Sequence, residues 1–374
     1  MAGIYVHVPF CKSRCAYCDF CSSTYAAPTR HAYTDALIAE IQARSQHSTG
    51  ILFRTIYLGG GTPSVLTDAD LGRIFHALRD NFAIVPDAEI TLEANPDDVC
   101  AARVQTWQAM GVNRLSMGVQ SLDDTMLRAL GRRHTAHQAV EAVAAAVAAG
   151  LHNVSIDLMY GLPGLTLRAW ERTLTEALAL PVTHLSAYCL SVEDGTPIAA
   201  SIARGDLTLP DDETCEAQYR MLVGKTREAG FTHYEISNFA RPGFPSRHNS
   251  AYWDGTPYVG LGAAAHSFDG TTRRANTTDI RRYTTSAGNP PFDTETLSVR
   301  DRINEAIFLG LRTYEGINTK IFAERFGTDT LRRLSADAAP AISRGLLRQS
   351  PERLALTERG VFVSDDVISD LILV

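Results

Sequence analysis

The sequence predicts an α/β fold, a partial (β/α)6 barrel of the TIM type followed by a mainly helical C-terminal domain. Short β-rich runs alternate six times with helical stretches, a pattern typical of parallel strands with helices outside them. The runs are apolar nearly throughout, as expected of strands that are buried on both faces. Gly and Pro residues follow several of them.

The strands are expected where β-branched and aromatic residues gather. In chain order these runs are 4–8 (IYVHV), 53–59 (FRTIYLG), 89–94 (EITLEA), 114–120 (RLSMGVQ), 153–161 (NVSIDLMYG) and 184–190 (HLSAYCL). Each is followed by a longer stretch with helical spacing of its apolar residues. We expect these helices at about 33–46, 68–81, 98–110, 136–149, 167–179 and 212–229.

The chain is expected to divide into three parts. Residues 1–235 form the barrel, 236–298 a Gly-, aromatic- and Thr-rich extension, and 299–374 the C-terminal domain with a short hairpin and a last helix near its end. In barrels of this kind the C-terminal strand ends hold the functional residues. We therefore place the following on one rim: Cys11–Cys18, the glycines 59–61, Glu93, Gln120 and Asp157.

Composition excludes several classes of protein. The formal net charge of the 374 residues is −7, so there is no basic footprint for nucleic acid. The longest near-apolar run, 142–151, is shorter than a membrane-spanning helix. The N-terminus lacks the charged and apolar regions of a secretory signal. We expect a cytoplasmic protein, in which clustered cysteines point to metal binding or catalysis rather than disulfides.

Four of the seven cysteines lie within eleven residues, at Cys11, Cys15, Cys18 and Cys21. The first three have the spacing C-x3-C-x2-C. A structural zinc site requires four ligands, and no second pair lies nearby, because the other three cysteines stand singly and are expected to be small buried hydrophobes. Three thiolates instead suit a [4Fe–4S] cube, with one iron left open for a small chelating molecule. Cys21 is expected to be a free thiol beside the site.

The motifs YVHVPFCKSRCAYCDF, YLGGGTPS, TLEANP, GVQS, LGRRH and IDLMYGLPG resemble the coproporphyrinogen dehydrogenase (HemN)/HemW branch of the radical S-adenosylmethionine (SAM) proteins. The resemblance covers nearly the whole chain. It implies that Cys11, Cys15 and Cys18 hold a [4Fe–4S] cluster whose open iron binds SAM. Cluster reduction in that family cleaves SAM to a 5′-deoxyadenosyl radical. The implied SAM contacts are Tyr5, Gly60, Gly61, Thr62, Glu93, Gln120, Arg132 and Asp157, with Arg133 as an alternative to Arg132.

Two activities occur in this branch. The dehydrogenase resembles C-x3-C-x2-C-x-C, where this chain has Phe20 in place of the last cysteine. It also has an N-terminal extension before its Tyr-x-His strand, whereas Tyr5 and His7 lie near the start of this sequence. No separate motif for its second SAM molecule is present. These differences favour the haem chaperones of the branch over oxygen-independent coproporphyrinogen III oxidation, which stays the alternative.

The segment RHNSAYWDG (247–255) resembles the haem-binding motif of those chaperones. It implies haem contacts from His248, Tyr252 and Trp253, because imidazole is a haem-iron ligand and the aromatic rings offer flat apolar faces. We expect this stretch to be an accessible loop, with His266 as a second candidate. The alternative is that these residues pack in the core. The expected function is to bind haem and pass it to apo-proteins, respiratory haem enzymes among them, while SAM cleavage, catalysis and the oligomeric state are left open.

Overall fold

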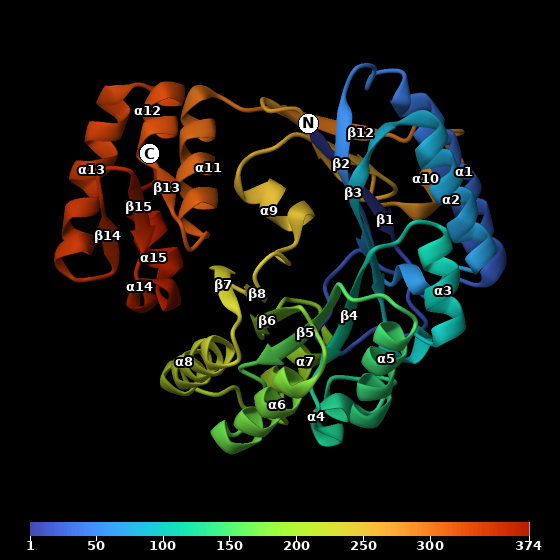
Figure 1. Cartoon of the computed structure of the whole chain (residues 1–374), viewed down its shortest axis with the longest axis horizontal. Coiled ribbons are helices and arrows are strands. Elements are labelled where there is room, and N and C mark those ends of the chain that lie inside the picture. Colours follow the sequence, from blue (N-terminus) through green and yellow to red (C-terminus); the bar gives the residue numbers. More distant parts are fainter. Residues whose placement is uncertain (374) are drawn as a thin grey trace.

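The computed structural model of the chain describes residues 1–373 and contains six adjacent parallel strands, as the sequence predicts (Figure 1). Neighbours in sequence are neighbours in the sheet, which is the register expected of successive βα units. The strands are β1 (Ala2–Val8), β2 (Leu52–Gly60), β3 (Ala83–Ala94), β4 (Arg114–Gln120), β5 (Val154–Tyr160) and β6 (His184–Cys189).

Helices follow these strands on the outside of the sheet (Figure 1). The expected ones are α1 (Ala27–Ser45), α2 (Asp68–Asn81), α3 (Ala101–Ala109), α5 (Ala136–Ala148), α6 (Leu167–Ala179) and α8 (Asp212–Glu228). Thr67, Thr135 and Thr166 cap α2, α5 and α6 through side-chain oxygens, which fixes where these helices begin. Four short elements were not expected: α4 (Asp124–Ala129), α7 (Pro197–Ala203) and the 3-10 turns η1 (Pro63–Val65) and η2 (Pro96–Asp98).

The extension after the sixth unit lengthens the same sheet at both ends. β8 (Asn238–Ala240) pairs with β6, and β7 (Thr232–Glu235) pairs with β8. β9 (Tyr258–Leu261) pairs parallel to β1 and is followed by β10 (His266–Phe268), β11 (Thr272–Asn276), α10 (Ile280–Thr284) and β12 (Phe292–Thr296). The chain therefore crosses from the β6 side to the β1 side between β8 and β9, and α9 (Arg247–Trp253) lies in that crossing.

The C-terminal part has its own hydrophobic cluster, which includes Ile303, Leu311 and Val367 and is distinct from the barrel core. Its elements are α11 (Val299–Leu311), β13 (Ile317–Asn318), α12 (Thr319–Phe326), α13 (Thr328–Ser343), β14 (Leu347–Gln349), β15 (Arg353–Leu356), α14 (Glu358–Phe362) and α15 (Ser364–Ser369). A hairpin is present, but it is β14–β15 and begins before the expected segment 352–373, where residues 358–362 are helical instead; β13 adds a third strand. The boundaries at 235 and 298 stay predictions. None of the helices in the described chain is long and apolar enough to span a bilayer.

Candidate functional site

A cavity of about 420 Å3 lies at the C-terminal ends of the barrel strands. The loop that follows β1 forms one wall and is held against the end of β2 by backbone hydrogen bonds: Gly61 N–H donates to Val8 O at 2.9 Å, and Thr62 N–H to Phe10 O at 2.8 Å. The predicted site residues that line the cavity are Cys11, Cys15, Cys18, Gly60, Gly61, Thr62, Glu93, Gln120, Arg132 and Asp157. Residues up to 146 positions apart in the chain are thus brought to one rim (157 − 11).

The three thiols on this wall each have a distinct environment. Thr62 Oγ1 donates to Cys11 Sγ at 3.5 Å, and Arg132 Nη1 donates to Cys15 Sγ at 3.2 Å. Burial raises the pKa of the Cys18 thiol. Within residues 1–373, no three Cys, His, Asp or Glu side chains converge on a point where a single metal ion could bind. A [4Fe–4S] cubane requires a different arrangement, because each of its three thiolates binds a separate iron.

Gly60 and Gly61 are required because neighbouring atoms lie too close to their Cα atoms for a side chain to fit. Gly60 has φ +108°, and a Cβ there would lie 2.6 Å from the His7 imidazole. A Cβ on Gly61 would lie 2.7 Å from the carbonyl oxygen of Phe10. Both distances are shorter than any real carbon contact, so the two glycines let the cysteine loop pack directly on the end of β2. The glycines therefore position the thiols, in addition to any contact that they make with a ligand.

Two carboxyl groups face the cavity without a cationic partner. Tyr57 Oη donates to Glu93 Oε1 at 2.5 Å, and Gly60 N–H to Glu93 Oε2 at 3.2 Å. Burial raises the pKa of Glu93 to about 7, and the nearby Asp157 adds to the effect. Burial also raises the pKa of Asp157 to about 6. In the described chain neither carboxyl is in an ion pair within 4.0 Å, so this end of the cavity suits a cationic ligand.

Gln120 reaches the cavity through a local distortion of β4. Its φ of +68° is in the left-handed region, which a residue other than glycine adopts at a cost of about 1–3 kcal/mol. The β4–β5 register shifts between Gly118 and Gln120. A bulge of this kind redirects a side chain at a strand end.

Of the two adjacent arginines that the sequence offers, only Arg132 lines the cavity. Arg132 lines the cavity, where Nη2 donates to Asn95 Oδ1 at 2.8 Å as well as to the Gly118 carbonyl. Arg133 is not among the lining residues and forms an ion pair with Asp97. Arg132 is therefore the guanidinium available beside the thiols.

Tyr5 and Cys21 do not line the cavity. The Tyr5 hydroxyl lies 3.0 Å from His7 Nδ1, and its ring stacks on Tyr57 with centroids 6.3 Å apart. His7 Nε2 in turn lies 3.0 Å from the carbonyl oxygen of Cys21. The Cys21 thiol donates to the Thr278 carbonyl at 3.7 Å. Both residues therefore stabilise the cysteine loop without lining the cavity. A SAM contact by Tyr5 stays a prediction.

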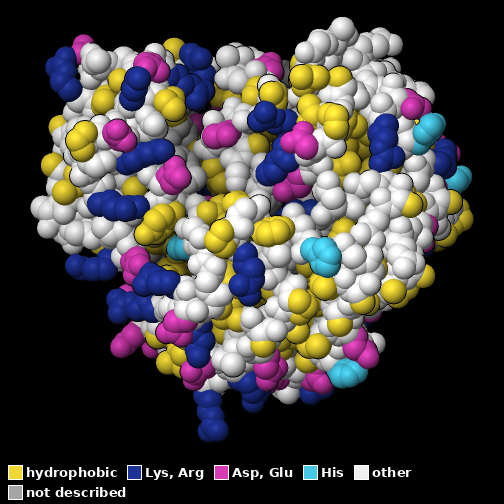
Figure 2. All heavy atoms as spheres, viewed as in Figure 1, with side chains coloured by type: hydrophobic (Ala, Val, Ile, Leu, Met, Phe, Trp, Pro, Cys, Tyr) yellow, Lys and Arg dark blue, Asp and Glu magenta, His cyan; other side chains and the backbone are white. Residues whose placement is uncertain are grey.

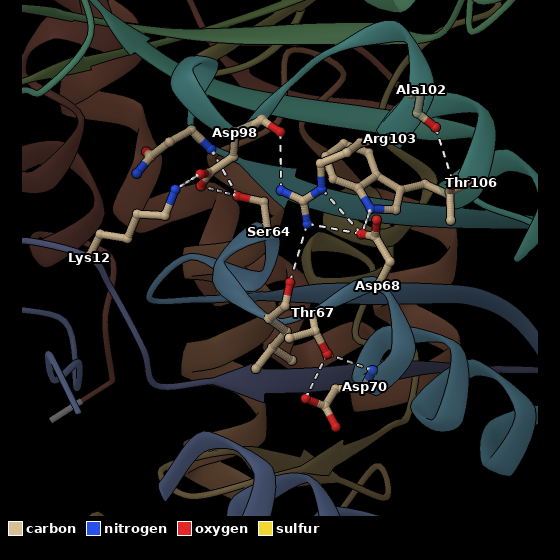
Figure 3. Close-up of polar contacts among 12 residues, drawn as sticks. Lys12, Ser64, Thr67, Asp68, Asp70, Asp98, Ala102, Arg103 and Thr106 are labelled. Carbon is tan, nitrogen blue, oxygen red and sulfur yellow. Dashed lines mark hydrogen bonds and ion pairs between the residues drawn. The ribbon is translucent and has the colours of Figure 1, made fainter. Parts of the chain in front are cut away.

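A polar network anchors the same loop from the other side (Figure 3). Lys12 forms an ion pair with Asp98, whose carboxylate also accepts from the Ser64 hydroxyl at 2.9 Å. Arg103 then ties Asp68 at the start of α2 to the Asp98 carbonyl. The side chain next to the first cysteine is thus fixed to η1 and η2.

Sequence reasoning missed several residues that line the cavity. They are Asn95, Ser116, Gly118, Met159, Tyr188, Cys189, Ser191 and Glu193, among others. Tyr188 and Cys189 end β6, and the strand-end rule would have found them had it been applied to the sixth strand. Ser116 and Met159 lie inside strands and have no signal in the sequence that sets them apart from core positions.

The cysteines outside the N-terminal motif are not the buried single residues that were expected. Cys100 and Cys189 are exposed. A Cβ on Gly161 would lie 2.7 Å from Cys189 Sγ and 3.5 Å from Cys215 Sγ, so these two thiols are neighbours. The prediction failed because β6 and α8 bring them together across 25 residues of intervening sequence (215 − 189 − 1).

The predicted haem motif is a helix, α9, rather than a loop. His248 is 2% exposed, with Nδ1 2.8 Å from Thr55 Oγ1 and Nε2 2.9 Å from the Tyr252 hydroxyl. Its ring stacks on Tyr57 with centroids 5.1 Å apart. The expectation of an accessible loop is therefore wrong, because α9 sits against the first residues of the barrel strands and both ring nitrogens have partners there. Trp253 is only partly buried, and His266 lies exposed on β10.

The comparisons with known proteins agree with this arrangement. Residues 5–177 match the model of the radical SAM superfamily, and residues 297–363 match that of the HemN C-terminal domain. The chain is 34% identical to the Heme chaperone HemW of Bacillus subtilis over 98% of each chain. It is 36% identical to that of Mycobacterium tuberculosis, covering 99% of this chain and 94% of the relative.

A mitochondrial protein and a solved structure extend the comparison. The bovine radical S-adenosyl methionine domain-containing protein 1 is 34% identical, over 99% of this chain and 87% of its own length. The structure of coproporphyrinogen III oxidase (HemN) from Escherichia coli superposes with a TM-score of 0.85 at 23% identity, covering 99% of this chain and 90% of the other. At that identity the structural likeness supports the fold alone.

Proposed function

Because the chain belongs to the HemW family of the radical SAM superfamily, we propose that it is a haem chaperone. It would bind a [4Fe–4S] cluster, SAM and haem, and deliver haem to apo-proteins, with respiratory haem enzymes as the expected acceptors. The observation that carries the proposal is the rim cavity, where three thiols, a guanidinium and two carboxyls without an ion-pair partner meet. The chain that forms it is similar to a haem chaperone over 98% of its length. A cytoplasmic location is part of the proposal, since a cluster of free thiols persists in a reducing compartment.

The cavity residues fit the two proposed cofactors. Cys11, Cys15 and Cys18 would hold the cluster, with Arg132 and Thr62 donating hydrogen bonds to its sulfur ligands. When bound, the cluster supplies an electron to the sulfonium of SAM. The Glu93 carboxylate would accept the ribose hydroxyls, and the unpaired charge of Glu93 and Asp157 would favour a cationic ligand over a neutral one. A guanidinium such as that of Arg132 suits the SAM carboxylate.

The cluster is tested by anaerobic reconstitution followed by iron and sulfide analysis. The triple variant Cys11→Ser, Cys15→Ser, Cys18→Ser is expected to lose the cluster, whereas Cys100→Ser, at an exposed thiol far from the motif in the sequence, is expected to retain it. SAM binding by calorimetry should disappear only in the triple variant. A triple variant that retains four irons and four sulfides per chain would contradict the assignment.

The haem role is tested separately from the cluster. Haem titrated into the reconstituted protein should give a saturable Soret shift, and the loaded protein should transfer haem to an apo-haemoprotein. The runner-up activity is checked in the same preparation with coproporphyrinogen III, SAM and reductant. Formation of protoporphyrinogen would replace the chaperone assignment by the oxidase one, and absence of haem binding would remove the chaperone assignment outright.

A further inference from the structure

A cavity of about 590 Å3 lies beside the first residues of β1, at the opposite end of the barrel strands from the cysteine rim. We call it the basal cavity. Its walls come from the end of α1 and the loop after it, from the strands β9 to β12, and from the loop before β12. The volume lies within the range of small-molecule and cofactor sites. None of the predicted cluster, SAM or haem residues lines it, so the proposed function leaves this cavity without a role.

Two arginines from distant parts of the chain meet at the basal cavity. Arg44, in the last turn of α1, donates from Nη2 to the Ser267 hydroxyl oxygen at 3.2 Å. Arg274 on β11 stands directly opposite Ser267 in the β10–β11 ladder. Residues paired in this way point to the same face of a sheet, with Cβ atoms about 4.5–5.5 Å apart. The two guanidinium groups therefore converge on one serine, one from a helix and one from a strand.

Neither guanidinium has an ionic partner within 4.0 Å among residues 1–373. Arg274 donates from Nε to Asn276 Oδ1 at 3.3 Å, and its Cζ lies 3.5 Å from the Phe292 ring centroid. A guanidinium stacked on a ring keeps the remaining N–H groups at its edge for an anion. Burial lowers the pKa of Arg274 to about 10, and the charge of Arg44 adds to the effect. Both stay cationic at neutral pH, so a bound anion would relieve their repulsion.

The carboxylates nearest to the two arginines are already engaged. Of the described residues on the cavity wall, only Asp269 is acidic, and its Oδ1 accepts three hydrogen bonds from Thr271 and Thr272. Glu40 lies outside the wall, is fully buried and accepts three hydrogen bonds from its own surroundings. The wall thus carries two guanidinium groups and the imidazole of His47 against one carboxylate.

The cavity between α9 and the helices α11 and α12 has no such excess of positive charge. Its volume is also about 590 Å3. Its wall carries as many acidic as basic side chains, namely Asp254, Glu305, Glu315, Arg302, Arg325 and Arg353. Figure 2 shows acidic and basic side chains mixed around the hollow between the C-terminal part and the barrel. Of these two cavities, the basal cavity is therefore the one whose charges select an anion.

The rest of the basal wall is largely apolar and includes the rings of Tyr258, Phe268 and Phe292. Aromatic walls suit a ligand with a flat apolar group. A carboxylate would bring a single negative charge to the two arginines, whereas a phosphate monoester carries about −1.5 to −2 at pH 7 and offers three acceptor oxygens. A phosphate monoester therefore matches the pair of cations better.

We propose that the basal cavity binds a small phosphate monoester, with the phosphate on Arg44 and Arg274 and a flat apolar group against the aromatic wall. This site lies at the other end of the barrel strands from the thiols. It does not depend on cluster, SAM or haem binding, so it can fail while the proposed function stands, and the reverse.

Calorimetric titration with three small probes tests the ligand chemistry. Phenyl phosphate carries both a phosphate and a ring, inorganic phosphate lacks the ring, and benzoate carries the ring with a single negative charge. We expect phenyl phosphate to bind at least about tenfold more tightly than either of the others. Inorganic phosphate or benzoate that binds as tightly as phenyl phosphate overturns the assigned ligand class. Absence of phenyl phosphate binding overturns the site itself.

A matched pair of double variants tests the role of the arginines. Arg44→Gln with Arg274→Gln removes both cations from the cavity, and Arg281→Gln with Arg282→Gln removes two exposed cations on α10 as the control. The dissociation constant of phenyl phosphate should rise at least about tenfold in the first double variant and stay unchanged in the second.

A second pair of variants tests the cavity by volume. Ala43→Trp fills it from α1, and Ala32→Trp adds the same ring at an exposed site on that helix. At constant ionic strength, phenyl phosphate should raise the melting temperature of wild type and of both controls, but not of the two cavity variants. Cluster content and melting without ligand verify that each variant is folded. Wild-type affinity in both cavity variants overturns the proposal.

Discussion

Single residues set the geometry of the rim, and Gly60 shows this most directly. Its backbone is left-handed and the His7 ring lies where a Cβ would stand. Gly50 has a similar φ of +80° but open space around it. Alanine substitutions at these two glycines can therefore separate the free-energy cost of a left-handed backbone from the cost of steric overlap.

We predict that Gly60→Ala destabilises the protein by more than the roughly 1–2 kcal/mol that a left-handed alanine costs. Displacing His7 should also release the carbonyl of Cys21 and lower cluster content. Gly50→Ala should cost only the backbone part and leave the cluster intact. Urea unfolding and iron analysis measure both effects. Equal losses in the two variants would show that the His7 contact is unimportant.

The raised pKa of Glu93 makes stability depend on pH. Its pKa is about 7 in the folded protein against a usual value of 4.5, so the folded state binds the proton more tightly. Stability of the ligand-free protein should fall as pH rises from about 4.5 to 7 and then level off. Glu93→Gln should therefore raise the melting temperature at pH 8 more than at pH 5, while weakening SAM binding.

The control for this prediction is Glu295→Gln, at an exposed position on β12. It should change neither the pH profile nor SAM affinity. A Glu93→Gln protein whose melting temperature shifts equally at pH 5 and pH 8 would mean that the carboxyl titrates normally in the fold.

At the scale of elements, α9 is capped twice at its N-terminus: the Ser246 hydroxyl oxygen accepts the Asn249 N–H at 3.3 Å, and a carboxylate from the neighbouring sheet accepts two further N–H groups. Glu89 on β3 is 5% exposed, and its two oxygens accept the backbone N–H groups of Arg247 and His248, each at 3.0 Å. These are first-turn donors that have no partner inside the helix. Glu89 therefore adds to the local Ser246 cap by satisfying two more of the backbone donors at the start of α9.

We predict that Glu89→Gln destabilises the protein by about 1–3 kcal/mol, because one amide donor would face a backbone donor at a buried site. Hydrogen exchange should rise at residues 246–254 first. Glu324→Gln, exposed on α12, should have no effect. Unchanged exchange in α9 would mean that the Ser246 cap and the packing of His248 and Tyr252, rather than Glu89, hold the helix.

Elements with strong local signals were predicted, and those defined by their neighbours were not. α2 and α6 were placed at both ends because Thr67 and Thr166 cap them and their apolar positions recur with helical period. β11 and β12 escaped prediction because TRRAN and FDTET carry no apolar alternation, and β12 is exposed along its length. β12 is the edge strand of the sheet and β11 is its neighbour, and both are defined by their pairing with the strand beside them rather than by their own sequence.

For the whole molecule, the barrel and its cysteine rim could be predicted from sequence, because both depend on short, ordered patterns. The position of α9 could not, since nothing in RHNSAYWDG says that the segment will lie under the barrel strands. The cavity of about 590 Å3 beside α9 was equally out of reach, because it forms where Trp253 meets residues such as Phe322 from the C-terminal part, which has its own core.

The crossing that carries α9 places one short helix between the proposed SAM site and a second cavity. His248 stacks on Tyr5 of the strand that leads into the cysteine loop, with centroids 6.4 Å apart, while Trp253 at the other end lines a cavity of about 590 Å3. Because α9 carries the predicted haem motif, the proposed function implies that SAM and haem binding are thermodynamically linked. If saturating SAM changes haem affinity by some factor, saturating haem must change SAM affinity by the same factor. Paired titrations would measure this coupling factor. A factor of one would mean that haem binding and release do not depend on whether SAM is bound at the rim.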